Sequence, residues 1–186
     1  MIKIFIDQGH NPRNPNAGAE GNGFREQDIT YRVGVELARL LNANPEFEAI
    51  LSRDTQDQIL GTSNAESLRL RVNKANSYGA DAFISIHLNA SYIVSAVGSE
   101  AYVYSLGTSA AVLAETILLR LTEATGYPDL GVNARPTLYV LRKTQMPATL
   151  VEIGFISNPQ EAVFMNDNTA LYARGIYNGI LTYYGF

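Results

Sequence analysis

The first apolar run of the sequence is Ile4-Phe5-Ile6-Asp7-Gln8-Gly9-His10. Its length and its β-branched residues are typical of a buried strand, and it ends at a glycine followed by a histidine. A second apolar run, Ala82-Phe83-Ile84-Ser85-Ile86-His87, also ends at a histidine. The chain has only these 2 histidines. Two histidines, each at the carboxyl end of a predicted strand, indicate one site built where two strands end.

Strand signals and helix signals alternate along the rest of the chain. Strands are predicted over 2–7, 47–52, 82–87, 99–104 (as an edge strand that carries Glu100), 137–141 and 149–153. Helices are predicted from about 26 to a turn at 42–45, over 68–75 as far as Gly79, from 108 or 109 to 125, from Asn158-Pro159-Gln160-Glu161 onward, and over about 169–183. Asn158 would be the N-cap of its helix, with Glu161 at the third position.

This alternation predicts the α/β class, because strands joined through helices form parallel, helix-covered sheets. We expect a mostly parallel, twisted sheet of about six strands with helices on both faces, a three-layer architecture of the phosphorylase/hydrolase-like kind. The 186 residues read as a single domain, 1–186. The glycine- and proline-rich loop over 8–24 is longer than most connections, which favours a functional role.

Composition excludes several classes of protein and site. The net charge of −4 argues against an intrinsic affinity for nucleic acid. The absence of cysteine means that any metal is held by nitrogen and oxygen atoms. No apolar run approaches the roughly 20 residues that span a bilayer, so we expect no membrane insertion. The first residues do not read as a signal peptide, which predicts a mature or excised domain, or a protein released by other means.

Four candidate groups fall on one edge of the predicted sheet, where ligands bind in such folds. His10 follows the first strand, His87 ends the third, Glu152 ends the last, and Glu26 opens the helix after the long loop. Two imidazoles and one carboxylate form a common catalytic zinc set, and a second glutamate would serve as general acid and base. No short zinc motif such as H-E-x-x-H is present.

Each of these residues also has an ordinary structural interpretation. The two histidines could simply satisfy hydrogen bonds at strand ends. Glu26 in the first turn of a helix could be there for the helix dipole, and Glu20 and Asp28 are rival acidic residues nearby. An unpaired carboxylate in an apolar run is costly, which favours a functional role for Glu152.

Longer motifs decide between these interpretations. They are Phe5-Ile6-Asp7-Gln8-Gly9-His10, Ala17-Gly18-Ala19 followed by Glu26, Ser52-Arg53-Asp54, Arg71 with Ala75-Asn76, Phe83-Ile84-Ser85-Ile86-His87-Leu88-Asn89-Ala90, and Met146-Pro147-Ala148 through Val151-Glu152-Ile153-Gly154-Phe155-Ile156-Ser157-Asn158. With these motifs the sequence resembles the zinc-dependent N-acetylmuramoyl-L-alanine amidases of the family 3 type. The resemblance runs through nearly the whole chain.

The resemblance implies a hydrolase that cleaves the amide between the lactyl group of N-acetylmuramic acid and L-alanine in bacterial peptidoglycan. It implies one zinc ion held by His10, Glu26 and His87, with Glu152 as the acid/base that activates the zinc-bound water. It also implies action at the cell wall, as the catalytic domain of an autolysin or of a phage endolysin, the latter made in the host cytoplasm. We expect a monomer.

Several residues near these motifs carry weaker expectations. Asn89 would support the site or cap a turn, and Asp7 would orient His10 or bond local backbone amides. Gln8 stands where the family has proline, and Leu130 stands where many members carry an arginine, for which Arg135 is a possible substitute. Two alternatives stay open: a zinc peptidase acting on the stem peptide, and a catalytically silent wall-binding or regulatory domain.

Overall fold

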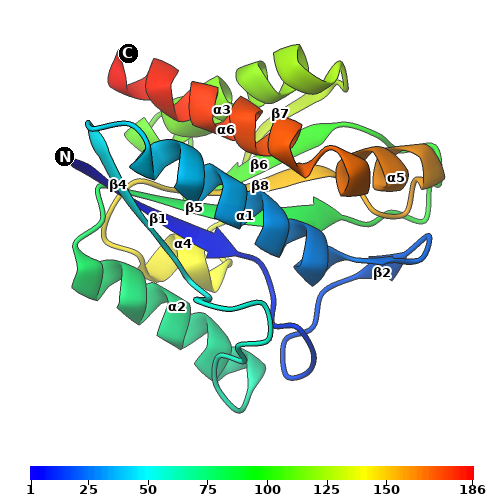
Figure 1. The fold of residues 1–186 in the computed structure, drawn as a ribbon, viewed down its shortest axis with the longest axis horizontal. Helices are drawn as coiled ribbons and strands as arrows, with labels where there is room; N and C mark the ends of the chain where they lie inside the picture. The colour runs from blue at the N-terminus through cyan, green and yellow to red at the C-terminus, as the bar shows by residue number, and fades with distance from the viewer.

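A six-stranded sheet in the order β4-β1-β5-β8-β6-β7 forms the centre of the structure, a computed structural model that describes residues 1–186 (Figure 1). Its strands are β1 (Ile2–Gln8), β4 (Phe47–Leu51), β5 (Ala82–Asn89), β6 (Ser99–Val103), β7 (Asp129–Ala134) and β8 (Ala148–Phe155). The long loop after β1 contains a small separate hairpin of β2 (Glu20–Gly21) and β3 (Phe24–Arg25).

The sheet is parallel except at one pairing. β1 pairs in parallel with β4 and β5, β5 with β8, and β6 with β7, whereas β6 runs antiparallel to β8. The predicted fold class, a mostly parallel sheet of about six strands, is therefore confirmed.

Six helices lie against the sheet in two layers. They are α1 (Glu26–Asn42), α2 (Asn64–Tyr78), α3 (Ser109–Thr125), α4 (Tyr139–Lys143), α5 (Pro159–Asp167) and α6 (Thr169–Tyr184). In Figure 1, α1, α3 and α6 lie on one side of the sheet, and α2 and α4 lie on the other. The predicted helices on both faces are confirmed.

The alternation of side chains along β5 decides which residues can form a site. Ile84 and Ile86 point into the larger core under α1, α3 and α6, whereas Phe83 belongs to a smaller core under α2 and α4. Successive side chains of a strand point to opposite faces, so Ser85 and His87 share the face of α2 and α4 with Phe83. The His87 side chain keeps 19% of its surface exposed there, because these two helices leave the carboxyl end of β5 uncovered on that face.

The caps of the helices follow local sequence signals. Thr108 caps α3 through its hydroxyl, and Asn158 accepts hydrogen bonds from the backbone amides of Gln160 and Glu161. Gly79 ends α2 in the left-handed region, with φ of 68°, which glycine adopts without steric strain. These three predicted boundaries are confirmed.

Two sequence predictions for the second half of the chain are wrong. Residues 137–141 were expected to form a strand, but the chain forms the helix α4 at Tyr139–Lys143. The strand 99–104 was expected at an edge, but β6 (Ser99–Val103) lies between β8 and β7, and the sheet edges are β4 and β7. The strand β7 was not predicted at all.

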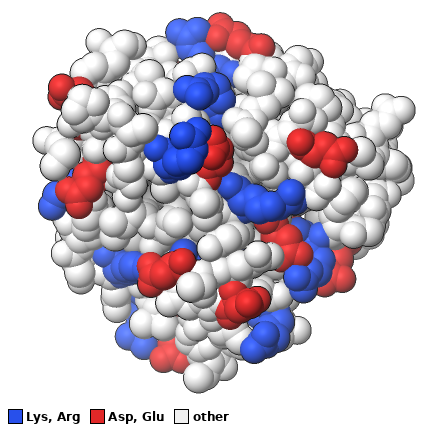
Figure 2. Space-filling model, viewed as in Figure 1, with Lys and Arg blue, Asp and Glu red and all other residues white.

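The surface carries no large region of one charge on the face drawn in Figure 2, where basic and acidic side chains are interspersed. This agrees with the small net charge of −4. None of the helices combines the length and the apolar character that crossing a membrane requires.

Candidate metal centre

His10 lies just beyond β1 in an unusual backbone conformation. Its φ is +68°, in the left-handed region, so the chain turns sharply after Gly9. Gly9 lies so close to β5 that a Cβ atom there would be 2.6 Å from the carbonyl oxygen of Ile86 and 2.7 Å from the ring of His87. Only glycine permits this approach, which brings the two histidine rings to a centroid distance of 4.8 Å.

Glu26, the first residue of α1, points its buried carboxylate between the two histidines. Its Oε1 lies 3.2 Å from Nε2 of His10 and 2.9 Å from Nδ1 of His87. Backbone amides fix the same carboxylate, because Leu88 donates to Oε1 and Ala19 donates to Oε2. Burial alone would raise the pKa of Glu26, but the hydrogen bonds and charges of the two histidines outweigh burial and hold it well below its usual value. The carboxylate is therefore charged at neutral pH.

One ligand atom from each of His10, Glu26 and His87 lies within 4.8 Å of the other two. Two imidazole nitrogens and one carboxylate oxygen suit a zinc ion, and a set of three protein ligands leaves a coordination position for water or substrate. These three residues could therefore hold a metal ion. The rival acidic residues lie elsewhere: Asp28 pairs with Arg25, and Glu20 is exposed in β2.

Glu152 lies directly beside this cluster, in β8. It is the register partner of His87 on one side and of Glu100 in β6 on the other. Its side chain is partly buried, and its Oε2 atom has no hydrogen-bond partner in the protein. Burial, and secondarily the charges of Glu26 and Glu100, raise the pKa of Glu152 well above its usual value. A carboxyl group with a raised pKa can both accept and donate a proton near neutral pH.

Sequence reasoning missed Glu100, which was treated as a charge on an edge strand. The amide nitrogen of Asn89 donates a hydrogen bond to Glu100, so these two residues form a polar pair next to Glu152. The β5–β8 ladder is irregular between His87 and Asn89, which turns Asn89 toward β6. Glu100 and Tyr102 alternate with buried residues, so they share one face of β6. This alternation is the only sequence signal that Glu100 could face the site.

Arg71 of α2 connects Asp7 to the cluster of candidate metal ligands. Asp7 Oδ1 accepts a 2.6 Å hydrogen bond from Arg71, and Oδ2 accepts one from Ser85. Arg71 in turn donates to the backbone carbonyls of Gln8 and His10. This buried ion pair therefore holds the segment of backbone that carries His10.

The other residues considered from the sequence lie outside the cluster. Arg135 is exposed, with its guanidinium 4.8 Å from the centre of the Tyr102 ring. Leu130 is 44% exposed in β7. Gln8 is buried in regular strand, where its side-chain oxygen accepts hydrogen bonds from Ser52 and from the backbone of Arg53.

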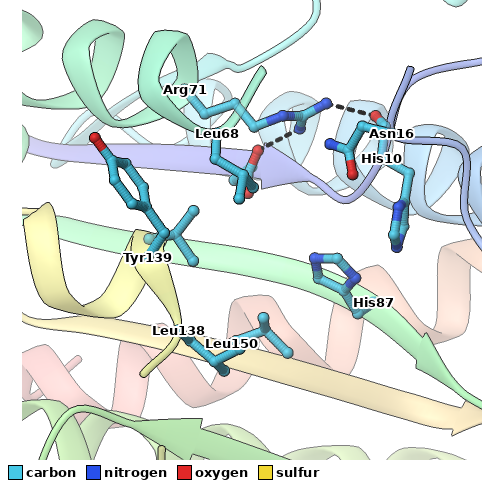
Figure 3. Close-up of a pocket in the computed structure, with 10 residues that line it drawn as sticks. His10, Asn16, Leu68, Arg71, His87, Leu138, Tyr139 and Leu150 are labelled. Carbon is cyan, nitrogen blue, oxygen red and sulfur yellow. Dashed lines mark hydrogen bonds and ion pairs between the residues drawn. The ribbon is translucent and has the colours of Figure 1, made fainter. Parts of the chain in front are cut away.

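A pocket of about 130 Å³ opens beside the two histidines on the face of α2 and α4 (Figure 3). In Figure 3 the rings of His10 and His87 stand at one end, apolar side chains from α2, α4 and β8 line much of the rest, and Arg71 and Asn16 also border the pocket. The fold and the cluster together define an α/β domain with a candidate two-histidine, one-glutamate metal site at the carboxyl ends of parallel strands.

Comparison with known proteins identifies the family. The model of the N-acetylmuramoyl-L-alanine amidase family matches residues 4–182. The sporulation-specific N-acetylmuramoyl-L-alanine amidase of Bacillus subtilis (strain 168) is 35% identical over 183 residues, which cover 97% of this chain and 67% of that protein. The amidase CwlM of Bacillus licheniformis is 35% identical over 184 residues, covering 97% and 68%.

A solved structure gives the same result. The catalytic domain of the amidase CwlV from Bacillus (Paenibacillus) polymyxa var. colistinus superposes with a TM-score of 0.87 at 30% identity, covering 100% of this chain and 99% of that chain. The chain belongs to the N-acetylmuramoyl-L-alanine amidase family. The resemblance that the sequence motifs indicated is thereby confirmed, and family membership supports amidase activity.

Proposed function

We propose that this chain hydrolyses the amide between the lactyl group of N-acetylmuramic acid and L-alanine in peptidoglycan. In this proposal His10, Glu26 and His87 hold one zinc ion, and Glu152 is the catalytic acid/base. The observation that carries the proposal is the position of Glu152. It neighbours His87 in the sheet, next to three residues that could hold a metal ion. Family membership supplies the chemical class of the substrate.

Zinc in such a site supplies Lewis acidity, which polarises a carbonyl group and makes water more acidic. The carboxylate of Glu26, which the amides of Ala19 and Leu88 hold in place, would balance part of the charge of a bound ion. His10 Nδ1 has no hydrogen-bond partner in the protein, so its ring is oriented by the turn at Gly9 and by its Nε2 contact.

Glu152 moves the proton. Its Oε2, free of protein partners, takes a proton from the attacking water while the water oxygen bonds to the lactyl carbonyl carbon. Glu152 then gives this proton to the alanine nitrogen as the carbon–nitrogen bond breaks. The products are a lactyl carboxylic acid and a peptide with a free alanine amino group.

The decisive test is a digest of purified peptidoglycan by zinc-loaded protein, by protein treated with a chelator, and by chelated protein with zinc restored. New alanine amino termini without new reducing sugar ends, lost with chelator and regained with zinc, are expected. Termini of other amino acids would instead establish a peptidase of the stem peptide. No release of either kind by protein that holds zinc would establish a silent domain.

Glu152→Gln tests the acid/base role separately from metal binding. We expect zinc content to be unchanged and the rate to fall by more than about 100-fold, the usual size of a general acid/base contribution. Near-normal turnover by this variant would exclude Glu152 from proton transfer.

We also propose that residues 1–186 act as one monomeric catalytic domain on the bacterial cell wall. Light scattering of the purified chain at several concentrations checks the monomer. A mass that rises to twice 20.3 kDa would contradict it.

A further inference from the structure

We infer that the pocket beside His10 and His87 is a subsite that takes one small apolar group of the substrate, attached to a carbon next to the scissile amide. This inference rests on the proposed function, because that function places the amide at the two histidines. It adds a property that the three candidate metal ligands do not supply: selection of substrates by the size of an uncharged substituent.

The walls of the pocket are mostly apolar and come from three elements. Leu68 lies on α2, Leu138, Tyr139 and Val140 lie at α4, and Leu150 lies on β8, two residues before Glu152. Figure 3 shows these side chains grouped to one side of the two histidines. A group that reaches into this space from the site of reaction therefore meets hydrocarbon.

The charged residues that also border the pocket are already paired. Arg71 uses all three guanidinium nitrogens on protein partners: Nη1 bonds to Asp7, Nη2 to the carbonyl oxygen of His10, and Nε to Ser67. The Asp7 carboxylate accepts hydrogen bonds from Arg71 and Ser85. Apart from the proposed zinc ion at the histidines, the pocket offers a charged ligand no free ionic partner to replace its hydration, so the part lined by Leu68, Leu138 and Leu150 favours an uncharged group.

Side chains of both α2 and α4 line the pocket. The side chain of Asn76, near the end of α2, bonds to the carbonyl oxygen of Lys143 and to the amide of Gln145, which ties the two helices together. A volume of about 130 Å³ is too small for a segment of the polymer. Only a terminal substituent fits, while the glycan and the rest of the peptide stay outside.

The size of the pocket sets the expected selectivity. Engineered apolar cavities of about 150 Å³ accommodate benzene. A pocket of about 130 Å³ therefore has room for more than one methyl group. The proposed substrate offers methyl groups on both sides of the amide, on alanine and on the lactyl group, and either can be the occupant.

Two series of soluble muramyl peptides show whether the alanine methyl or the lactyl methyl occupies the pocket. In the amine series alanine is replaced by glycine, 2-aminobutyrate or valine. In the acyl series the lactyl methyl is replaced by hydrogen or ethyl. For the series that enters the pocket, we expect loss of the methyl to lower kcat/KM by about 10-fold, and larger groups to be accepted within about 3-fold of the natural substrate.

Substitutions on opposite walls test the assignment. Leu68→Phe and Leu138→Phe narrow the pocket and should lower kcat/KM for the valine or ethyl substrate by about 10-fold relative to the natural one. Leu119→Phe makes the same change on an exposed position of α3, on the other face of the sheet, and should leave the ratio unchanged. If the ratio of kcat/KM between the larger and the natural substrate is unchanged in both series, in either folded wall variant, the inference is overturned.

Binding gives a readout that does not need turnover. Saturation-transfer NMR of zinc-loaded protein is recorded with L-alanyl-D-glutamate and with N-acetylmuramic acid, the two halves of the expected product. Strong saturation of the alanine or the lactyl methyl, abolished in Leu138→Phe, supports the subsite even if the protein cleaves no muramyl amide. Absence of methyl saturation in both ligands overturns the subsite, whereas the digest alone decides the proposed function.

Discussion

At the scale of single residues, Arg71 connects the buried structure with the reactive site. It is 1% exposed and bonds to Asp7 and to the backbone of Gln8 and His10. His10 has a positive φ, which a residue other than glycine adopts only when its surroundings hold it there. The Arg71 guanidinium supplies part of that constraint, so the ion pair contributes both to stability and to the position of a proposed metal ligand.

Asp7→Asn should lower the free energy of unfolding at pH 7 by about 3 kcal/mol, because it leaves the buried charge of Arg71 without its partner. The loss should depend on pH. Burial alone would raise the pKa of Asp7, but the charge and hydrogen bond of Arg71 outweigh burial and hold it below its usual value. The stabilisation is therefore present above the unfolded-state pKa of about 3.9 and is lost as the pH falls toward the folded-state pKa. Urea unfolding of metal-free protein between pH 7 and pH 3 measures this.

Ser85→Ala is the matched control for that series. It removes a hydrogen bond to the same carboxylate and keeps the ion pair, so it should cost about 1 kcal/mol and keep most of the slope of stability against pH, because Arg71 lowers the pKa of Asp7 more than Ser85 does. If Asp7→Asn unfolds at the same urea concentration as the natural chain at pH 7, the ion pair does not have the role assigned to it.

The reactive residues could be predicted from the sequence because their signals are local. A histidine after a strand, a glutamate at a helix start and a glutamate within an apolar run can each be recognised in a short stretch of sequence. Glu100 was not predicted as part of the site, because its role depends on the neighbour of β6. That neighbour, β8, is fixed by a tertiary pairing of residues about 50 positions apart, which no local pattern specifies.

At the scale of elements, the first turn of α5 is hydrogen-bonded to the end of β8. A glutamate at the third helical position commonly bonds back to the N-cap amide. Glu161 instead accepts hydrogen bonds from the amides of Gly98 and Phe155, 2.9 and 2.8 Å away. The helix start thus joins the loop after β5 to the strand that carries Glu152.

Glu161→Gln should lower the free energy of unfolding by about 2 kcal/mol. The carboxylate offers an oxygen to each of the two amides, whereas glutamine offers one oxygen and points its NH₂ group at the second donor. Urea unfolding measures the loss, and hydrogen exchange at the amides of Gly98 and Phe155 localises it.

Asn158→Ala serves as the comparison, because it removes the N-cap of the same helix and should cost about 1 kcal/mol. It should leave the amide of Gly98 protected from exchange. Equal exchange of the Gly98 amide in both variants would show that Glu161 acts only through the helix.

The elements that were mispredicted have a common physical cause. Residues 137–141 form a short apolar run, and such a run fits a strand or a buried helical turn equally well. In the structure, Val140 and Leu141 of α4 pack into the smaller core. β7 has mostly exposed residues and includes Gly131, so it is held by backbone pairing with β6 and has no apolar pattern to predict it from.

At the scale of the whole molecule, the parallel sheet converts distant sequence positions into one site. His10, Glu26 and His87 lie at the end of β1, the start of α1 and the end of β5. The sequence predicted this convergence because the carboxyl ends of parallel strands meet at one edge. The side-chain geometry, including the pocket beside the histidines, depends on the packing of α2 against α4, which no sequence pattern specifies.

A metal bound by residues from three elements should stabilise the whole fold, because the unfolded chain has no such site. With free zinc at 100 times its Kd, the gain is about 2.7 kcal/mol. For a chain of this size that corresponds to a rise in Tm of about 5 to 10 °C. Calorimetry with zinc and with chelator measures it. His87→Ala should abolish the rise, whereas Glu152→Gln should keep it, because Glu152 is not a proposed ligand.

The pH dependence of this rise separates binding at the histidines from binding elsewhere. Zinc binds the neutral form of imidazole, so protons and zinc compete for His10 and His87 and zinc binding there weakens as the pH falls. The rise in Tm should therefore be larger at pH 8 than at pH 5, and amidase activity should decline with it as the pH falls. Exposed carboxylates remain ionised at pH 5, so a zinc effect of constant size down to that pH would place the metal on surface carboxylates. That outcome would remove the metal centre from the proposed mechanism.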